Sequence, residues 1–229
     1  MYLEYKEAGL TMDQFINLIK HKYKHSKYAY TARLDPMARG VIPILVDDEC
    51  LDIKKHLSTN KIYNVKIILG IQTDSDDPLG IIQKIDLIDD FDSFLSKNIH
   101  HFLIKDKTFD QKFHYFSTKA LQMRKHYRHE DSFHSVQIFQ SNILSTGFIK
   151  FTDWKEEIIE TINKIDNKKN FRQDDIINQW KLKDFDKLPF IELQLKVSSG
   201  FFVRQFVRDI SIDLNQPMFA YDIYRKDIL

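Results

Sequence analysis

Alternation of apolar and polar residues predicts strands in two parts of the chain. In the stretch from Lys61 to Ile71, apolar side chains occupy every second position up to Gly70 and a polar turn, and residues 191–197 repeat the pattern. A continuous apolar run at residues 41–46 predicts a third strand that is buried on both faces.

Apolar residues spaced three or four positions apart predict several helices. The first covers about residues 12–24, and a capping-box pattern of Thr11 and Gln14 marks its start. Others are expected at residues 89–103, 156–165 and 173–183, and through Phe206, Val207 and Ile210. The chain therefore mixes helices and strands along its length.

The composition is that of a globular protein. The 229 residues are 43% apolar and 13% aromatic, and the length favours one domain. A single cysteine, Cys50, excludes an internal disulfide framework and fits a reducing compartment. No apolar run has the length needed to cross a bilayer, and the N-terminus lacks the order of a signal peptide. We therefore expect a soluble, cytoplasmic protein.

The distribution of charge is more informative than the formal net charge of +1. Between Lys20 and Arg39, six Lys or Arg residues accompany a single acid, with three tyrosines interleaved. A second run, from Gln111 to Arg128, holds five Lys or Arg residues and no acid. Either run alone could equally be a solvated face. Together they predict two arms of a phosphate-binding surface.

Residues Tyr30 to Gly40 contain the candidate reactive group, Asp35. Pro36 fixes its own backbone angle and pushes Asp35 toward extended conformations, while Gly40 allows a turn or a close backbone approach. An isolated Leu-Asp-Pro sequence is more often a simple surface turn. The residues around it decide between a turn and a reactive loop.

This stretch resembles the signature of the TruB family of tRNA pseudouridine synthases, Gly-His-Thr-Gly-Thr-Leu-Asp-Pro-Leu-Ala-Thr-Gly. The matching residues are Thr31, Leu34, Asp35, Pro36, Ala38 and Gly40. The departures are Tyr30 for histidine, Ala29 and Ala32 for glycine, and Arg33 and Arg39 for threonine. The resemblance makes Asp35 the catalytic aspartate, and we expect Tyr30, Arg33 and Arg39 to contact the substrate.

Two weaker matches flank this signature. Lys6, Gly9 and Thr11 fit the family's opening Lys-Pro-x-Gly-x-Thr, although its proline is replaced. The run from Lys61 to Gly80 fits Lys-x-Tyr followed by Leu-Gly-x-x-Thr-x-x-x-Asp-x-x-Gly, with a spacing that we read as shifted by one residue around Asp76 and Asp77. By this resemblance Tyr63 stacks beneath the target base. The alternative is an ordinary core tyrosine.

Further matches lie toward the C-terminus. The segment that ends at Arg204 resembles Ser-x-Gly-Thr-Tyr-Ile-Arg, with Gly200, Phe202, Val203 and Arg204 in corresponding places, and the resemblance pairs Arg204 with the catalytic aspartate. The segment from Gln111 weakly resembles the family's Gln-x-Pro-Pro-x-Tyr-Ser-Ala thumb, with Phe113 and His114 replacing both prolines. We expect a basic thumb-like insertion at about residues 106–135, with Lys119 contacting RNA. Tyr224, in place of a leucine in a closing Leu-Arg-Arg motif, is a further expected substrate contact.

We expect neither a metal site nor a cofactor. The acidic segment at residues 74–80 resembles a calcium loop, but its glycine falls one place late and Ile85 stands where a bidentate glutamate is needed. The histidines form no His-Glu-x-x-His pair, and one cysteine argues against a structural zinc site. The implied reaction has no net redox change, so a carboxylate suffices to start it.

The resemblance implies one α+β catalytic domain over residues 1–229, with a large, mostly antiparallel mixed sheet flanked by helices and no C-terminal RNA-binding domain. The implied enzyme is a monomer that converts a uridine of tRNA to pseudouridine, at position 55 of the T-loop, with the tRNA T-arm as its partner. Two alternatives stay open. One is a non-catalytic RNA-binding protein or RNA chaperone that has kept the fold, and the other is an isomerase acting on a different RNA.

Overall fold

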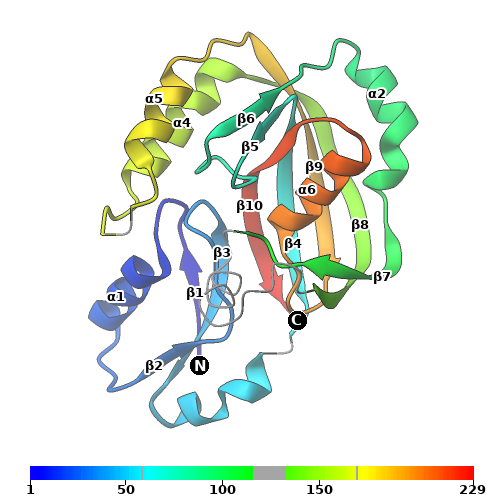
Figure 1. Ribbon diagram of the computed structural model, residues 1–229. Helices are drawn as coiled ribbons and strands as arrows, with labels where there is room; N and C mark the ends of the chain where they lie inside the picture. The colour runs from blue at the N-terminus through cyan, green and yellow to red at the C-terminus, as the bar shows by residue number, and fades with distance from the viewer. Residues whose placement is uncertain (58, 116–132, 169) are drawn as a thin grey trace.

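The computed structural model describes residues 1–57, 59–115, 133–168 and 170–229 (Figure 1). Its strands are β1 (Tyr2–Lys6), β2 (Tyr28–Tyr30), β3 (Arg39–Val46), β4 (Lys61–Leu69), β5 (Ile71–Thr73), β6 (Ile82–Ile85), β7 (Lys105–Lys112), β8 (Phe133–Lys150), β9 (Lys187–Val197) and β10 (Met218–Ile228). Its helices are α1 (Met12–Lys22), η1 (Asp47–His56), α2 (Phe91–Asn98), η2 (Ile99–His101), α4 (Phe151–Asn163), α5 (Gln173–Lys181) and α6 (Val203–Asp213). Within these ranges, no helix has the length and apolar character needed to span a membrane.

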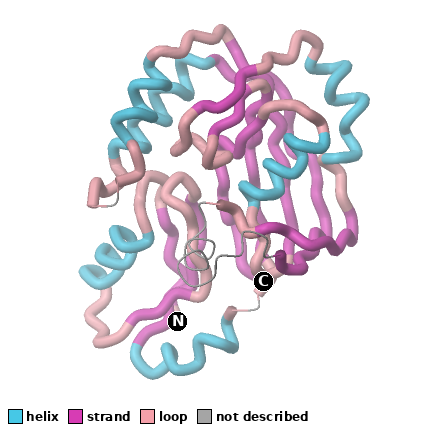
Figure 2. Tube along the Cα trace, in the orientation of Figure 1, coloured by secondary structure: helices cyan, strands magenta, loops and turns pink. Residues whose placement is uncertain are grey.

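One large mixed sheet organises the described residues (Figure 2). Its strand order is β1-β3-β10-β4-β9-β8-β7, and β2 adds to β3. The β3–β10 pair is parallel, whereas the other pairs in this sheet are antiparallel. A separate hairpin, β5–β6, follows β4 directly. The expected α+β class with a large, mostly antiparallel mixed sheet is therefore confirmed.

Helices cover both faces of this sheet. On one face, Phe15 of α1, Phe91 of α2 and Phe206 of α6 belong to the same apolar core as Tyr63. On the other face, α4 and α5 form a second core around two buried tryptophans. The alternation of β4 and β10 separates the two cores, because successive side chains of a strand point to opposite faces. We call the first the main face and the second the rear face.

The element boundaries differ from those expected, for identifiable reasons. The strand expected to reach Ile71 breaks at Gly70, whose φ of +95° redirects the chain into the β5–β6 hairpin. The first helix has the expected capping box but ends at Lys22, because Tyr23 is extended. The helix expected at residues 89–103 is α2 followed by η2, and the one expected at residues 156–165 begins earlier, at Phe151.

Gly40 permits the parallel contact between β3 and β10. It pairs with Arg225, and its φ is +129°. A Cβ atom at this position would lie 2.2 Å from the carbonyl oxygen of Arg225, far inside van der Waals contact. The end of the Asp35 loop and the C-terminal strand can therefore approach only through a residue without a side chain.

We predict that Gly40→Ala lowers the free energy of unfolding by about 3 kcal/mol or more, because strain at positive φ adds to a backbone clash. Val41→Ala, one residue further along β3, is the control and should cost about 1 kcal/mol. Urea unfolding followed by circular dichroism measures both. Equal losses in the two variants would contradict the argument.

Candidate active site

Asp35 lies in the loop between β2 and β3, where its side chain keeps 42% of its exposure. Lys6 of β1, which is fully buried, contacts the backbone of this loop. Its ammonium donates hydrogen bonds to the carbonyl oxygens of Asp35, Pro36 and Ala38, at 3.1, 3.3 and 2.7 Å. Burial lowers the pKa of Lys6 to about 7, whereas the charge of Asp35 favours the ammonium. The backbone of the loop is thus fixed while its carboxylate stays accessible.

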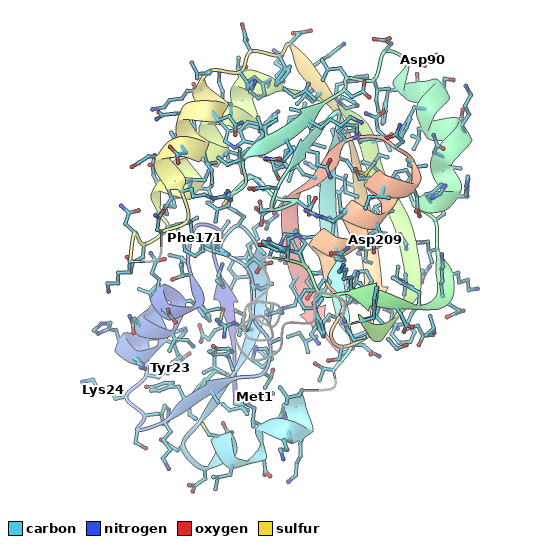
Figure 3. All side chains as sticks on the ribbon, viewed as in Figure 1. Met1, Tyr23, Lys24, Asp90, Phe171 and Asp209 are labelled. Atoms are coloured by element: carbon cyan, nitrogen blue, oxygen red, sulfur yellow. The ribbon has the colours of Figure 1, made fainter. Side chains whose placement is uncertain are left out.

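Arg204 joins this loop to two other parts of the chain. It sits in the first turn of α6, the helix on which Figure 3 labels Asp209, and is 6% exposed. Its Nη2 atom lies 2.8 Å from Oδ2 of Asp35. Its Nη1 atom lies 3.2 Å from Oδ2 of Asp77 and donates a 3.0 Å hydrogen bond to the carbonyl oxygen of Ser75. The ion pair expected between Asp35 and Arg204 is present.

The protonation of Arg204 follows from these contacts. Burial alone would lower the pKa of its guanidinium, but the charges of Asp35, Asp77 and Asp76 outweigh burial and raise that pKa. Arg204 is therefore a permanent cation whose charge is shared between a half-exposed carboxylate and a buried one.

Asp77 is the partner that the sequence analysis missed. Its carboxylate is 4% exposed, and Oδ1 accepts hydrogen bonds from the hydroxyl of Ser75 at 2.7 Å and the amide of Leu79 at 2.9 Å. Counted from Thr73, the family motif has its aspartate at position 77 and its glycine at position 80, so no shift of spacing is needed. The one-residue shift that the sequence analysis read around Asp76 and Asp77 is therefore unnecessary, and the unshifted count identifies Asp77.

Tyr63 extends from β4 into the main-face core, where it is 6% exposed. Leu34 and Ala38 of the Asp35 loop and Phe206 of α6 belong to the same core. The hydroxyl of Tyr63 makes no hydrogen bond to any residue in the described ranges. Tyr63 thus lies on the face that carries Asp35 and Arg204, and its role beneath a base stays a prediction.

Tyr30 and Arg33 form a pair at the start of the Asp35 loop. Nη1 of Arg33 donates a 3.0 Å hydrogen bond to the Tyr30 hydroxyl, and the guanidinium lies 5.5 Å from the ring centroid. Arg33 is exposed, so the pair presents an aromatic face and a cation within five residues of Asp35.

Arg39 and Tyr224 lie elsewhere. Arg39 forms a two-point contact with Asp222, at 3.0 and 2.7 Å, and its guanidinium lies 4.5 Å from the centre of the Tyr224 ring. Tyr224 follows Ile223 of the main-face core, so its side chain points to the rear face. The structure therefore does not bring these two predicted substrate contacts together with Asp35. Lys119, the remaining predicted contact, lies outside the described residues, as does most of the expected thumb-like insertion.

The acidic segment at residues 74–80 is neutralised by basic side chains. Asp74 pairs with Arg172 at 2.7 Å, Asp76 with Arg208 at 2.5 Å, and Asp77 with Arg204. In the described parts of the chain, no group of three or more His, Cys, Asp or Glu side chains is arranged to hold a metal ion.

Asp77 should make stability depend on pH. Burial raises its pKa from 3.8 to about 6, against the opposing charge of Arg204. The folded protein then binds more protons than the unfolded chain between these values, so this contribution is present below pH 3.8 and is lost as the pH rises through about 6.

We therefore predict that the stability of the wild-type protein relative to Asp77→Asn decreases between about pH 4.5 and about pH 7.5, by on the order of 3 kcal/mol at most. Urea unfolding of both proteins at the two pH values measures this difference. A relative stability that is unchanged or increases with pH would show that the pKa of Asp77 is not raised in the folded protein.

Comparisons with known proteins identify the family and the fold that this chain resembles. The sequence model of the family described as "TruB family pseudouridylate synthase (N terminal domain)" matches residues 20–158. A tRNA pseudouridine synthase B from Malacoplasma penetrans is 22% identical over 226 residues, covering 97% of this chain and 82% of that protein. One from Psychrobacter arcticus is 33% identical over 104 residues, covering 43% of this chain and 27% of that protein.

Two solved structures share the fold. A Cbf5-Nop10-Gar1 complex aligns with a TM-score of 0.56 and 12% identity, covering 98% of this chain and 47% of the matched one. An H/ACA RNP bound to a substrate RNA containing 2′-deoxyuridine aligns with a TM-score of 0.52 and 12% identity, covering 97% and 45%. The chain thus spans about half the length of the matched chains in these structures. Because the family model matches more than half of its residues, this chain belongs to the TruB family of pseudouridylate synthases.

Proposed function

We propose that this protein isomerises a uridine of tRNA to pseudouridine, at position 55 of the T-loop, with Asp35 as the nucleophile. The observation that carries the proposal is the ion pair between Asp35 and Arg204, in which a half-exposed carboxylate is oriented by a buried guanidinium. Family membership and the names of the relatives support tRNA as the substrate.

The reaction rearranges bonds within one nucleotide. The bond between N1 of uracil and C1′ of ribose breaks, the base turns, and C5 forms a new bond to C1′. The C5 proton is then lost, N1 gains a proton, and no electrons enter or leave. Asp35 can attack the nucleotide or stabilise charge that develops at the sugar, and both roles require an ionised carboxylate. Arg204 supplies a fixed positive charge 2.8 Å from this carboxylate.

The surroundings of Asp35 suit an extruded base. Pulling a uridine from its stack costs a few kcal/mol, and stacking on an aromatic side chain returns about 1–3 kcal/mol per base. Tyr63 is the candidate platform, because it lies on the same face of the sheet as Arg204. The pair formed by the half-buried Tyr30 and the exposed Arg33 offers a second aromatic surface beside the loop, at the point where the family has histidine.

We predict that the wild-type protein releases tritium from unmodified tRNA labelled at uracil C5, and that Asp35→Asn lowers this release by at least about 1,000-fold with little change in tRNA affinity. Asp52→Asn, a surface acid on η1, is the control and should be as active as the wild type.

A tRNA with cytidine at position 55 tests the proposed target, because it should release no tritium. Release from that tRNA, or only from another RNA, would refute the target. If the wild-type protein binds tRNA but releases no tritium from any RNA, the isomerase is refuted in favour of the non-catalytic RNA-binding alternative.

Exposed lysines after α1 should supply part of the RNA affinity. Lys24 and Lys27 lie in the first basic run, in the connection between α1 and β2, and both are exposed. If the protein neutralises about five phosphates, the logarithm of the association constant should fall with the logarithm of salt concentration with a slope of about −3 to −4.

We predict that Lys24→Ala combined with Lys27→Ala makes this slope shallower by about 1 to 1.5. The control is Lys97→Ala on α2, which lies across the molecule from α1 in Figure 1. This variant should leave the slope unchanged. Fluorescence anisotropy of a labelled T-arm stem-loop over a salt series measures the slopes. An unchanged slope in the double variant would remove these lysines from the RNA surface.

A further inference from the structure

A second arginine on α6 anchors the turn that carries Asp77. Arg208 lies one helical turn after Arg204, and its Nε atom is 2.5 Å from Oδ2 of Asp76. Its Nη2 atom also donates a 3.0 Å hydrogen bond to the carbonyl oxygen of Asp74. The side chain of Asp76 is fully buried, whereas 29% of the Arg208 side chain is exposed. Arg208 therefore contacts Asp76 from the side that faces solvent.

A histidine completes this anchor from the other side. His114 follows β7 by two residues, is fully buried, and its Nε2 atom lies 2.9 Å from the same Oδ2 of Asp76. Burial lowers the pKa of His114, so the imidazole is neutral, and burial raises the pKa of Asp76 to about 6, so the carboxylate is ionised at neutral pH. His114 therefore donates Nε2–H to Asp76 without adding a charge.

The position of Asp76 explains why this anchor matters. The residue before it, Ser75, gives its carbonyl oxygen to Arg204, and the residue after it, Asp77, forms the buried ion pair with Arg204. Asp76 also has a φ of +55°, a left-handed conformation that an aspartate keeps only when its surroundings hold it there. If its side chain were released, the turn could relax and both contacts to Arg204 would shift.

The same end of β7 also holds the backbone just before α6. The side-chain amide of Gln111 donates to the carbonyl oxygen of Phe202 at 3.0 Å and accepts from the Phe202 amide at 2.8 Å. Gln111 and His114 thus fix the two segments that meet at Arg204, the start of α6 and the turn at residues 75–77. Both belong to the stretch that begins the second basic run.

We propose that His114 and Arg208 are positioning residues for the reaction: by anchoring Asp76 they fix Ser75 and Asp77 around Arg204, and so orient the carboxylate of Asp35. This inference rests on the proposed function. It assigns a role to His114, which replaces a proline of the family's thumb motif. It also assigns a role to Asp76, the acid that directly precedes Asp77. It also means that the start of the second basic run, through His114, helps to orient the carboxylate of Asp35.

The first test compares His114→Leu, which removes the donor, with His114→Gln, whose amide nitrogen can occupy a similar place. Single-turnover tritium release from saturating tRNA should fall by about 10- to 100-fold in His114→Leu, as a displacement of about 1 Å can cause, and should recover to within about threefold in His114→Gln. The dissociation constant for tRNA should change by less than about threefold in both.

Arg208→Gln removes the ion pair between Arg208 and Asp76. It should lower the single-turnover rate in the same way as His114→Leu. The surface variant His100→Leu should behave as the wild type. If folded His114→Leu and Arg208→Gln both keep the wild-type rate, or if His114→Gln fails to recover activity in a folded protein, the proposal is overturned.

The second test does not need activity. In protein labelled with ¹⁵N-arginine, the side-chain Nε–H resonance of Arg204, assigned through Arg204→Lys, reports the environment of its guanidinium. We expect this resonance to shift or broaden in His114→Leu and Arg208→Gln, and to return toward its wild-type position in His114→Gln.

The two tests separate the two proposals. An inactive wild-type protein with the expected resonance changes would refute the proposed isomerase and retain the positioning role. An Arg204 resonance that is identical in the wild type and in folded His114→Leu would refute the positioning role, whatever the activity.

Discussion

The site depends on one buried cation. Arg204 is nearly inaccessible to solvent, and a guanidinium removed from water is tolerated only when carboxylates and carbonyl oxygens replace its hydration. Here the Asp35 loop and the turn before Pro78 supply that replacement, and the first turn of α6 carries the cation itself. Three segments that are far apart in the sequence are therefore tied to a single charge, and a displacement of any one leaves a charge partly unpaired.

The groups around this cation divide into an accessible layer and a buried layer. Asp35, the proposed nucleophile, is half-exposed, whereas Lys6, Asp77 and His114 are buried and contact the segments that surround it. Lys6 restrains the backbone of the Asp35 loop, and Asp77 restrains the guanidinium. This division is physically reasonable, because a reactive side chain is positioned more rigidly when its supports exclude water and cannot change rotamer.

The sequence predicted this centre only in part. Asp35 and Arg204 belong to short segments that resemble family motifs, so their pairing could be expected from the resemblance, and the structure brings them into contact. Asp77 was overlooked because two adjacent aspartates share one segment, and only the contact with Arg204 separates the buried ion-pair partner from its neighbour. The anchoring by His114 was not foreseeable, since it joins residues 38 positions apart in the chain.

The predicted contacts at Arg39 and Tyr224 illustrate a different limit. Whether a strand residue faces the substrate or the rear of a sheet depends on the pairing register, and a shift of one residue reverses the face. The β3–β10 register pairs Tyr224 with Arg39 and sends their side chains away from Tyr63. That pairing joins residues 185 positions apart, which no local pattern of apolar and polar residues encodes.

The central place of β10 has a consequence for how the protein is made. β10 lies between β3 and β4, so the strand that follows the Asp35 loop acquires its inner neighbour only after residues 218–228 leave the ribosome. Until then β3 and β4 each present an unpaired edge, which is open to association with other chains. Newly synthesised protein is therefore exposed to edge-to-edge association until β10 has paired with both strands.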